Sequence, residues 1–168
     1  MLIKLAALFS FLCLSLPSAH ADNSEADVRL HSLNDSEVTG TVQFWDKKDP
    51  DGVEIHYQLA GLYPEETYAI LFRKQGNCDK RDINSVTQIL TEKNLYTGDV
   101  PYLQSDEEGK VDKTVRIDHA SVNAAELLSS EPGPNALALR SLIVADKTNT
   151  NDPANPGVRV ACGVVMPK

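Results

Sequence analysis

The side chains that could perform chemistry are few and widely spaced in this sequence of 168 residues. Beyond the first 21 residues, histidines stand only at His31, His56 and His119. A metal site needs several donors that converge, and these positions form no recognisable ligand spacing. No nucleophile–base pair, phosphate loop or nucleotide fingerprint is present. We interpret the histidines as surface or locally bonded residues, with a weak adventitious metal site as the alternative.

The cysteines are the clearest candidates for a chemical pair. Residues 1–21 have the pattern of a secretory signal peptide, with Lys4, an apolar run over 5–16 and a small-x-small cleavage motif at the end. Removing this leader discards Cys13 and leaves Cys78 and Cys162. Two cysteines in an exported chain predict one disulfide and a periplasmic or secreted location.

The rest of the chain is the right size for a single domain. Residues 22–36 are polar and are expected to form a flexible N-terminal segment, and 37–168 are expected to form the folded domain. The net charge of −8 disfavours nucleic acid and anionic membrane surfaces as partners. The apolar run of the leader is too short to span a bilayer.

Alternation of apolar and polar residues predicts β-strands throughout the domain. In the first of these, Val38, Val42 and Phe44 fall on one face and polar residues on the other. Residues 79–95 are compatible with either a short helix or a strand. The predicted strands cover residues 37–44, 53–59, 67–73, 111–117, 138–145 and 157–165.

Three motifs resemble the copper/zinc superoxide dismutase family. Residues 157–164, Gly-Val-Arg-Val-Ala-Cys-Gly-Val, are similar to its closing signature, and Gly76-Asn77-Cys78 is similar to the disulfide loop of its bacterial periplasmic members. Residues 98–101 and 106–110 resemble a further segment of the family, in the same order. The resemblance implies an all-β fold, an eight-stranded antiparallel Greek-key barrel or sandwich with one disulfide.

The same resemblance locates the family's metal ligands, and most of them are missing. The positions of copper-binding histidines are occupied by Leu71, Arg73 and Ala145, and that of a zinc-binding histidine by Tyr96. Leucine and alanine have no donor atom, and arginine stays protonated. Only Asp99 remains of the four zinc ligands, and one carboxylate does not make a site. Members of the family use copper and zinc, whereas these residues predict no metal cofactor.

Arg159 corresponds to the arginine that draws superoxide toward copper in this family. It has two possible roles here: hydrogen bonds to backbone carbonyls of the disulfide loop, or binding of a small anion. We expect Arg73 to lie near Arg159, where Tyr68 and Tyr96 would complete an anion pocket. In the alternative that we favour, Arg73 pairs with Asp99 in place of the lost metal.

The sequence therefore predicts a secreted superoxide dismutase-like protein that lacks both metal sites and is not an enzyme. Its partner would be another protein or a small anion, and a homodimer is compatible with the sequence. One alternative is a superoxide dismutase or copper-handling protein with rearranged ligands, which would require clustered His, Cys or Met. Another is a purely structural exported domain.

Overall fold

The computed structural model describes residues 25–48, 51–73, 76–79, 102–118, 122, 137–146 and 157–168. The predicted signal peptide lies outside these residues and stays a prediction. Every element that is described is a β-strand. In this part of the chain, no helix has the length and apolar character needed to cross a membrane.

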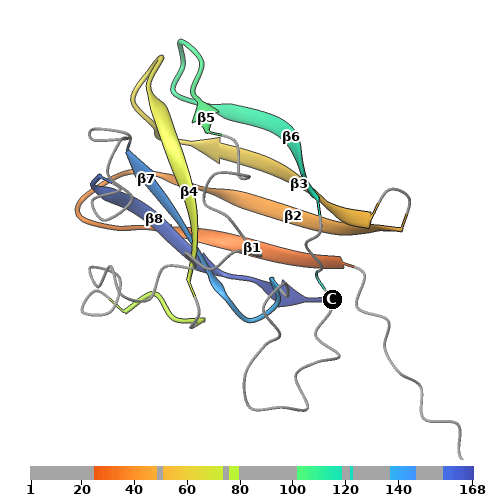
Figure 1. Ribbon diagram of the computed structural model, residues 1–168. Helices are drawn as coiled ribbons and strands as arrows, with labels where there is room; N and C mark the ends of the chain where they lie inside the picture. The colour runs from red at the N-terminus through yellow and green to blue at the C-terminus, as the bar shows by residue number, and fades with distance from the viewer. Residues whose placement is uncertain are drawn as a thin grey trace, which may run out of the picture.

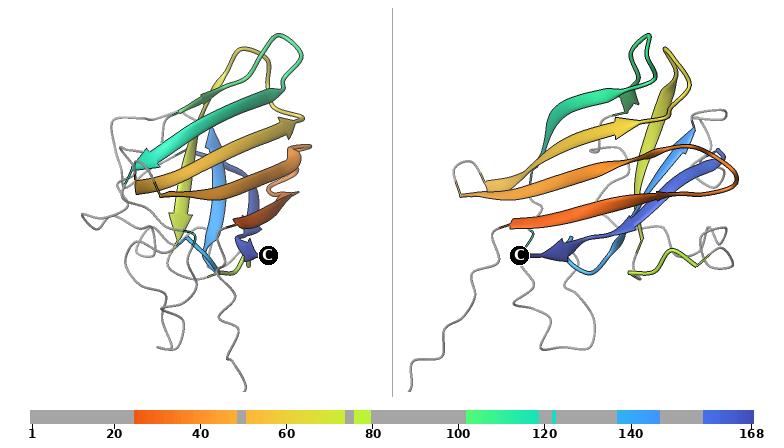
Figure 2. Two further views of the ribbon diagram at one scale, coloured as in Figure 1. Left: turned by 90° about the vertical axis from the view of Figure 1, so that its right-hand side faces the viewer. Right: turned by 180° about the vertical axis from the view of Figure 1, so that it is seen from behind.

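The strands form one antiparallel sheet that curls into a nearly closed barrel (Figures 1 and 2). Its order is β5-β4-β7-β8-β1-β2-β3-β6, and β9 pairs with β1 beside this path. The end strands β5 and β6 contact each other, which almost closes the barrel. The strands are β1 Glu25–Ser32, β2 Thr39–Lys48, β3 Asp51–Ala60, β4 Thr67–Arg73, β5 Leu103–Gln104, β6 Val111–Asp118, β7 Ser141–Asp146, β8 Arg159–Val164 and β9 Met166–Pro167.

The barrel has two halves, which the β3–β4 connection joins. One half contains β1, β2, β3 and β6, and the other contains β5, β4, β7 and β8. Because β3 and β4 are consecutive but not adjacent, the chain crosses an end of the barrel, as in a Greek key. The predicted eight-stranded antiparallel Greek-key barrel is confirmed.

The strands form where the sequence alternates, and the apolar face of each strand fills the barrel. Val42 and Phe44 on β2 are fully buried, as are Ile55 and Tyr57 on β3, whereas His56 between them points outward. Phe44 pairs with Ile55 in the register of the two strands. Burying each such side chain is worth about 1.5–3 kcal/mol, which stabilises this register against a slip by one residue.

The expectation of a flexible segment over residues 22–36 is wrong for Glu25–Ser32, which form β1. This strand pairs with β2 from Glu25 opposite Trp45 to Leu30 opposite Gly40, and it pairs with β8 further along. Its burial alternates, with the inward side chains of Ala26, Val28 and Leu30 at 1–2% exposure. The period of two supplies an apolar face, and the charged residues between stay on the outside. Strand β1 thus links the two halves of the barrel.

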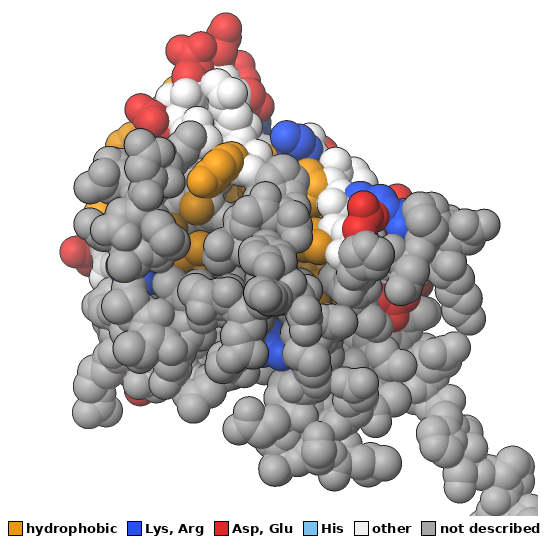
Figure 3. Space-filling view, in the orientation of Figure 1, with side chains coloured by type: hydrophobic (Ala, Val, Ile, Leu, Met, Phe, Trp, Pro, Cys, Tyr) orange, Lys and Arg blue, Asp and Glu red, His pale blue; other side chains and the backbone are white. Residues whose placement is uncertain are grey.

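Two turns dock against each other at one tip of the barrel. In the β5–β6 turn, Asp106 Oδ1 accepts hydrogen bonds from the backbone N–H groups of Glu108 and Lys110, at 3.0 and 2.7 Å. Gly109 has φ of 70°, and a Cβ there would approach the Leu62 carbonyl oxygen at 2.1 Å. This glycine is therefore required both by conformation and by the close approach of the β3–β4 turn. The exposed carboxylates of both turns gather at this tip (Figure 3).

Candidate functional site

The candidate site is the outer face of β4, β7 and β8, where the family resemblance locates the copper ligands. On β4, Ile70 and Phe72 point into the barrel, so Leu71 and Arg73 point outward. The register then defines three rows across the outer face. These rows are Arg73–Ser141, Leu71–Ile143–Cys162 and Ala69–Ala145–Arg159.

A β-bulge in β8 brings Arg159 onto this face. Val144 pairs with Ala161, but Ala145 pairs with Arg159, so Val160 is the extra residue. In regular alternation, two residues three positions apart would point to opposite faces. The bulge absorbs one residue, so Arg159 and Cys162 both point outward while Ala161 packs in the core.

The outer face carries an apolar cluster where the family would hold copper. The cluster consists of Leu33, Leu71, Ile143, Ala145 and Cys162, each at most 8% exposed, with Cys78 packed against it. Leu71 and Ala145 are two of the former ligand positions. Copper needs several nitrogen or sulfur donors, and these two side chains have none. The described residues of this face therefore do not fit the metal.

No set of three or more His, Cys, Asp or Glu side chains is arranged to hold a metal ion within the part of the chain that the structure describes. Of the histidines, His31 lies on β1 and is exposed, and His56 on β3 bonds to Asp112 at 2.7 Å. His119, Tyr96 and Asp99 lie outside the described residues. The predicted fate of the zinc site is therefore untested.

Arg73, the third former ligand position, is fully buried. Its proposed pairing with Asp99 stays a prediction, because Asp99 lies outside the described residues. The expectation that the Arg73 and Arg159 side chains are neighbours stays a prediction, although the two residues lie in different rows of the sheet. Arg73 pairs with Ser141, whereas Arg159 belongs to the row of Ala69, four residues along β4. That separation is about 13 Å of strand.

Tyr68 also does not join an anion pocket with these arginines. Its side chain belongs to the barrel core, and its hydroxyl accepts a hydrogen bond from the Tyr63 backbone N–H at 2.9 Å. Burial raises the pKa of the Tyr68 phenol. The physical reason is the alternation of β4, which turns position 68 inward when position 71 points outward.

Arg159 is a polar group of the face whose donors the described contacts do not fully satisfy. Its side chain is 8% exposed, and its Nε and Nη2 atoms are buried and donate no hydrogen bond within the described structure. Desolvation by burial lowers the pKa of this guanidinium. Within the described residues, these two atoms make none of the expected hydrogen bonds to the disulfide loop. Arg159 therefore offers buried, charged donors to a small acceptor.

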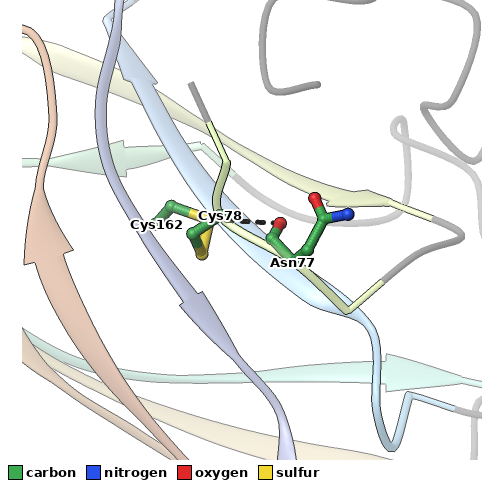
Figure 4. Close-up of a disulfide and its surroundings, with 3 residues drawn as sticks. All are labelled: Asn77, Cys78 and Cys162. Carbon is green, nitrogen blue, oxygen red and sulfur yellow. Dashed lines mark hydrogen bonds between the residues drawn. A yellow bond between two sulfur atoms is a disulfide. The ribbon is translucent and has the colours of Figure 1, made fainter. Parts of the chain in front are cut away.

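The disulfide joins the loop that follows β4 to strand β8 (Figure 4). Cys78 and Cys162 are 84 residues apart in sequence and 5.8 Å apart between Cα atoms, so the structure contains the predicted bond. Gly76 lets the loop lie on the chain before β7, since a Cβ would meet the Leu139 carbonyl oxygen at 2.0 Å. At Gly163, a Cβ would approach the Arg29 carbonyl oxygen on β1 at 2.5 Å. Gly76 and Gly163, two glycines of the family-like motifs, are therefore required because a Cβ at either position would clash with a backbone carbonyl.

Sequence reasoning missed a cavity of about 370 Å³ at the barrel end between the β1–β2 connection and the β3–β4 turn. Its lining includes Asp35 and Glu37, together with Tyr63 and the buried Tyr68. The two carboxylates repel anions, so this cavity does not suit the anion that was expected as a partner. The alternation of apolar residues in the adjoining strands gives no signal for this cavity, because the cavity is formed by connections from different parts of the chain.

The nearly closed eight-stranded barrel, with its last long strand stapled by a disulfide, defines a superoxide dismutase-like fold. Residues 38–165 match the copper/zinc superoxide dismutase family (SODC), and the chain belongs to this family. Among solved structures, it is similar to a double mutant of a SOD-like protein from Bacillus subtilis in which a tyrosine and a proline are replaced by histidines. That match has a TM-score of 0.64 at 20% sequence identity and covers 83% of this chain and 96% of that chain. No curated protein matches the sequence.

Proposed function

We propose that this family member has lost its copper and zinc sites and works, outside the cytoplasm, by binding a small anion at Arg159. It is not a superoxide dismutase in this proposal. The observation that carries it is the outer face of β4, β7 and β8, where apolar side chains stand at ligand positions beside an arginine with unused buried donors.

The loss of catalysis rests on what the residues can donate. The family reaction cycles copper between two oxidation states, which requires imidazole donors in a fixed geometry. Leu71 and Ala145 pack with Ile143 instead, so the space that a ligand would need is filled by hydrocarbon. Arg73 adds a positive charge that repels a cation.

Binding of an anion rests on Arg159 itself. A buried guanidinium with two unpaired nitrogen donors is costly, because desolvation is not compensated by hydrogen bonds. An oxyanion that accepts from Nε and Nη2 in the bidentate manner would remove this cost. The fork geometry favours planar carboxylates or tetrahedral oxyanions of similar spacing.

The first experiment measures metal content. The purified protein, with its disulfide intact, is incubated with Cu²⁺ and Zn²⁺, desalted and analysed for both metals beside a superoxide assay with a free-copper control. We expect near-zero copper and no activity above the control. Stoichiometric copper with dismutation would overturn the proposal and restore the enzyme with rearranged ligands.

The second experiment tests the anion site. Thermal unfolding is measured with increasing formate, nitrate, sulfate and phosphate at constant ionic strength. At least one anion should raise the midpoint in the wild-type protein and not in Arg159→Gln. The matched control is Arg116→Gln, since Arg116 is an outward arginine that pairs with Asp118 at 2.8 Å on the other half of the barrel. Equal responses of wild type and Arg159→Gln would contradict the site.

Export is tested separately. If residues 1–21 are a signal peptide, the protein recovered from the exported fraction should begin at Asp22. Protein that stays in the cytoplasm with an intact N-terminus would contradict export, but it would have no bearing on the proposed anion site.

A further inference from the structure

One imidazole lies beside the disulfide, on a strand that the sequence did not predict. His31 on β1 is the direct partner of Cys162 on β8 in the antiparallel register. Directly opposed residues point to the same face, with Cβ atoms about 4.5–5.5 Å apart. Cys162 points outward into the apolar cluster, so His31 also lies on the outer face, where it is exposed to solvent.

The two cysteine residues differ in exposure. Cys162 is fully buried at the centre of its row, between Ile143 and His31. Cys78 is only partly buried and lies in the loop over the face (Figure 4). An external thiolate can therefore reach the Cys78 sulfur more easily than the Cys162 sulfur. When it attacks Cys78, the leaving group is Cys162, and the rate rises as that leaving thiolate is stabilised.

The charged groups around Cys162 are mostly cationic. His31 faces it from β1, and Arg29 lies two residues earlier on the same outer side of that strand. Arg159 lies on the same face of β8, across the bulge. Among the described residues the opposing charge is Asp79, exposed next to Cys78. In the row of Cys162, β7 and β4 contribute Ile143 and Leu71, and the cationic Arg73 lies two residues further along the outer side of β4. Nearby cations favour the thiolate over the thiol.

We infer that the Cys78–Cys162 disulfide is a directional site for exchange with small thiols, in which His31 stabilises and protonates the departing Cys162 sulfur. The thiolate RS⁻ attacks Cys78 Sγ, a bond forms between these sulfurs, and the bond between the two cysteines breaks. The electron pair goes to Cys162 Sγ, which takes a proton from the His31 imidazolium. A second thiolate then attacks the mixed disulfide and releases RSSR and Cys78 as a thiolate. The protein gains two electrons, and two thiols become one disulfide.

Asn77 has a lesser and opposite effect. Its carbonyl oxygen lies 4.0 Å from Cys162 Sγ, which carries no hydrogen while the disulfide is intact. After reduction this oxygen can accept a weak S–H hydrogen bond, which stabilises the protonated thiol. The imidazole is therefore most important at the moment the sulfur leaves.

The test is the rate of disulfide reduction by excess glutathione between pH 5 and 8, corrected for the fraction of glutathione present as thiolate. Histidine changes charge over this range. At pH 5.5 we expect His31→Gln to react about fivefold more slowly than the wild-type protein, and we expect the two rates to converge near pH 8. His31→Lys should stay fast at both pH values, because its charge persists. His56→Gln, which removes the outward imidazole of β3, should follow the wild-type profile.

The site of attack gives an independent readout. Trapping the first product and mapping it by mass spectrometry should place glutathione on Cys78. Glutathione on Cys162, or identical pH profiles for His31→Gln and wild type, would overturn the inference. Thermal midpoints of the variants are compared first, and because His31 is exposed they should be unchanged. A slower rate in His31→Gln at pH 5.5 that His31→Lys does not restore would also overturn it.

Discussion

The outer faces of the two halves of the barrel have opposite characters. On β2, β3 and β6 most outward residues are polar and reach solvent, such as Thr41, His56 and Thr114. On β4, β7 and β8 most outward residues are buried, and Ile143 and Ala145 are fully so. One half of the barrel is therefore a sheet that is buried on its inner face alone, whereas the sheet of the other half is buried on both faces. The second half has a surface on which a site can be built, and in this chain that surface is apolar.

The largest expected effect comes from removing the disulfide on the half of the barrel that is buried on both faces. Cys78→Ala removes the disulfide, and the free energy of unfolding should fall by about 4–5 kcal/mol, since the closed loop is long. Urea unfolding measures it. The reduced wild-type protein is the control and should lose a similar amount. A loss below about 1 kcal/mol would mean that docking of Gly76 alone holds the loop.

The next effect compares outward residues of the two halves directly. Ile143→Ala creates a cavity in the apolar cluster and should cost about 3 kcal/mol. The matched variant Thr114→Ala changes an exposed outward residue of β6 and should stay within about 0.5 kcal/mol. Both are measured by urea unfolding with the disulfide intact. Equal effects would contradict the difference between the two faces.

A smaller effect concerns the β3–β4 turn, which connects the halves. Glu65 has φ of 56°, and its N–H donates to the Asp106 carbonyl oxygen at 3.1 Å. Glu65→Gly relieves the left-handed strain, and the free energy of unfolding should rise by about 0.5–1 kcal/mol.

Glu66→Gly is the control for this turn, because Glu66 does not have positive φ. It gains no relief from strain and only increases the freedom of the unfolded chain, so it should not stabilise the protein. Stabilisation by both variants would indicate an effect of charge at the acidic tip instead.

The smallest expected effect concerns the half of the barrel whose outer face is exposed to solvent. The hydrogen bond from His56 lowers the pKa of the Asp112 carboxyl. A carboxyl whose pKa is lowered by folding contributes stability above its unfolded pKa, and this contribution is lost as the pH falls through the folded value. The wild-type protein should therefore be slightly more stable than Asp112→Asn at pH 7, and the difference should begin to shrink as the pH falls below about 4. A difference that grows in acid would contradict this sign.

Much of the fold could be predicted from alternation and family motifs, and β1 shows where this fails. Strands such as β2 and β3 carry large inward residues, so their pattern is clear. In β1 the first inward residue is the small Ala26, and polar residues precede the strand. The polar composition of the segment therefore hides the alternation of Val28 and Leu30, which indicates a strand. Because β1 was missed, its outward His31 could not be placed beside Cys162.

The candidate site could be predicted in its positions but not in its geometry. The structure places Leu71, Arg73 and Ala145, the residues that the motifs singled out, on one face of the sheet. The motifs could not show that Arg73 and Arg159 lie in separate rows or that Tyr68 turns inward, because both depend on strand register. Register is a pairing between distant segments, and a single sequence contains no direct measure of it.

The extra residue in β8 has a consequence for how this chain can change during evolution. Apolar substitutions at Val160 alter volume only, but deleting this residue would restore regular alternation and send either the Arg159 guanidinium or the Cys162 sulfur into the barrel. One outcome would bury a charge in the core and the other would prevent the disulfide. Point mutations can therefore accumulate on this strand, whereas a change of length between Arg159 and Cys162 cannot be tolerated.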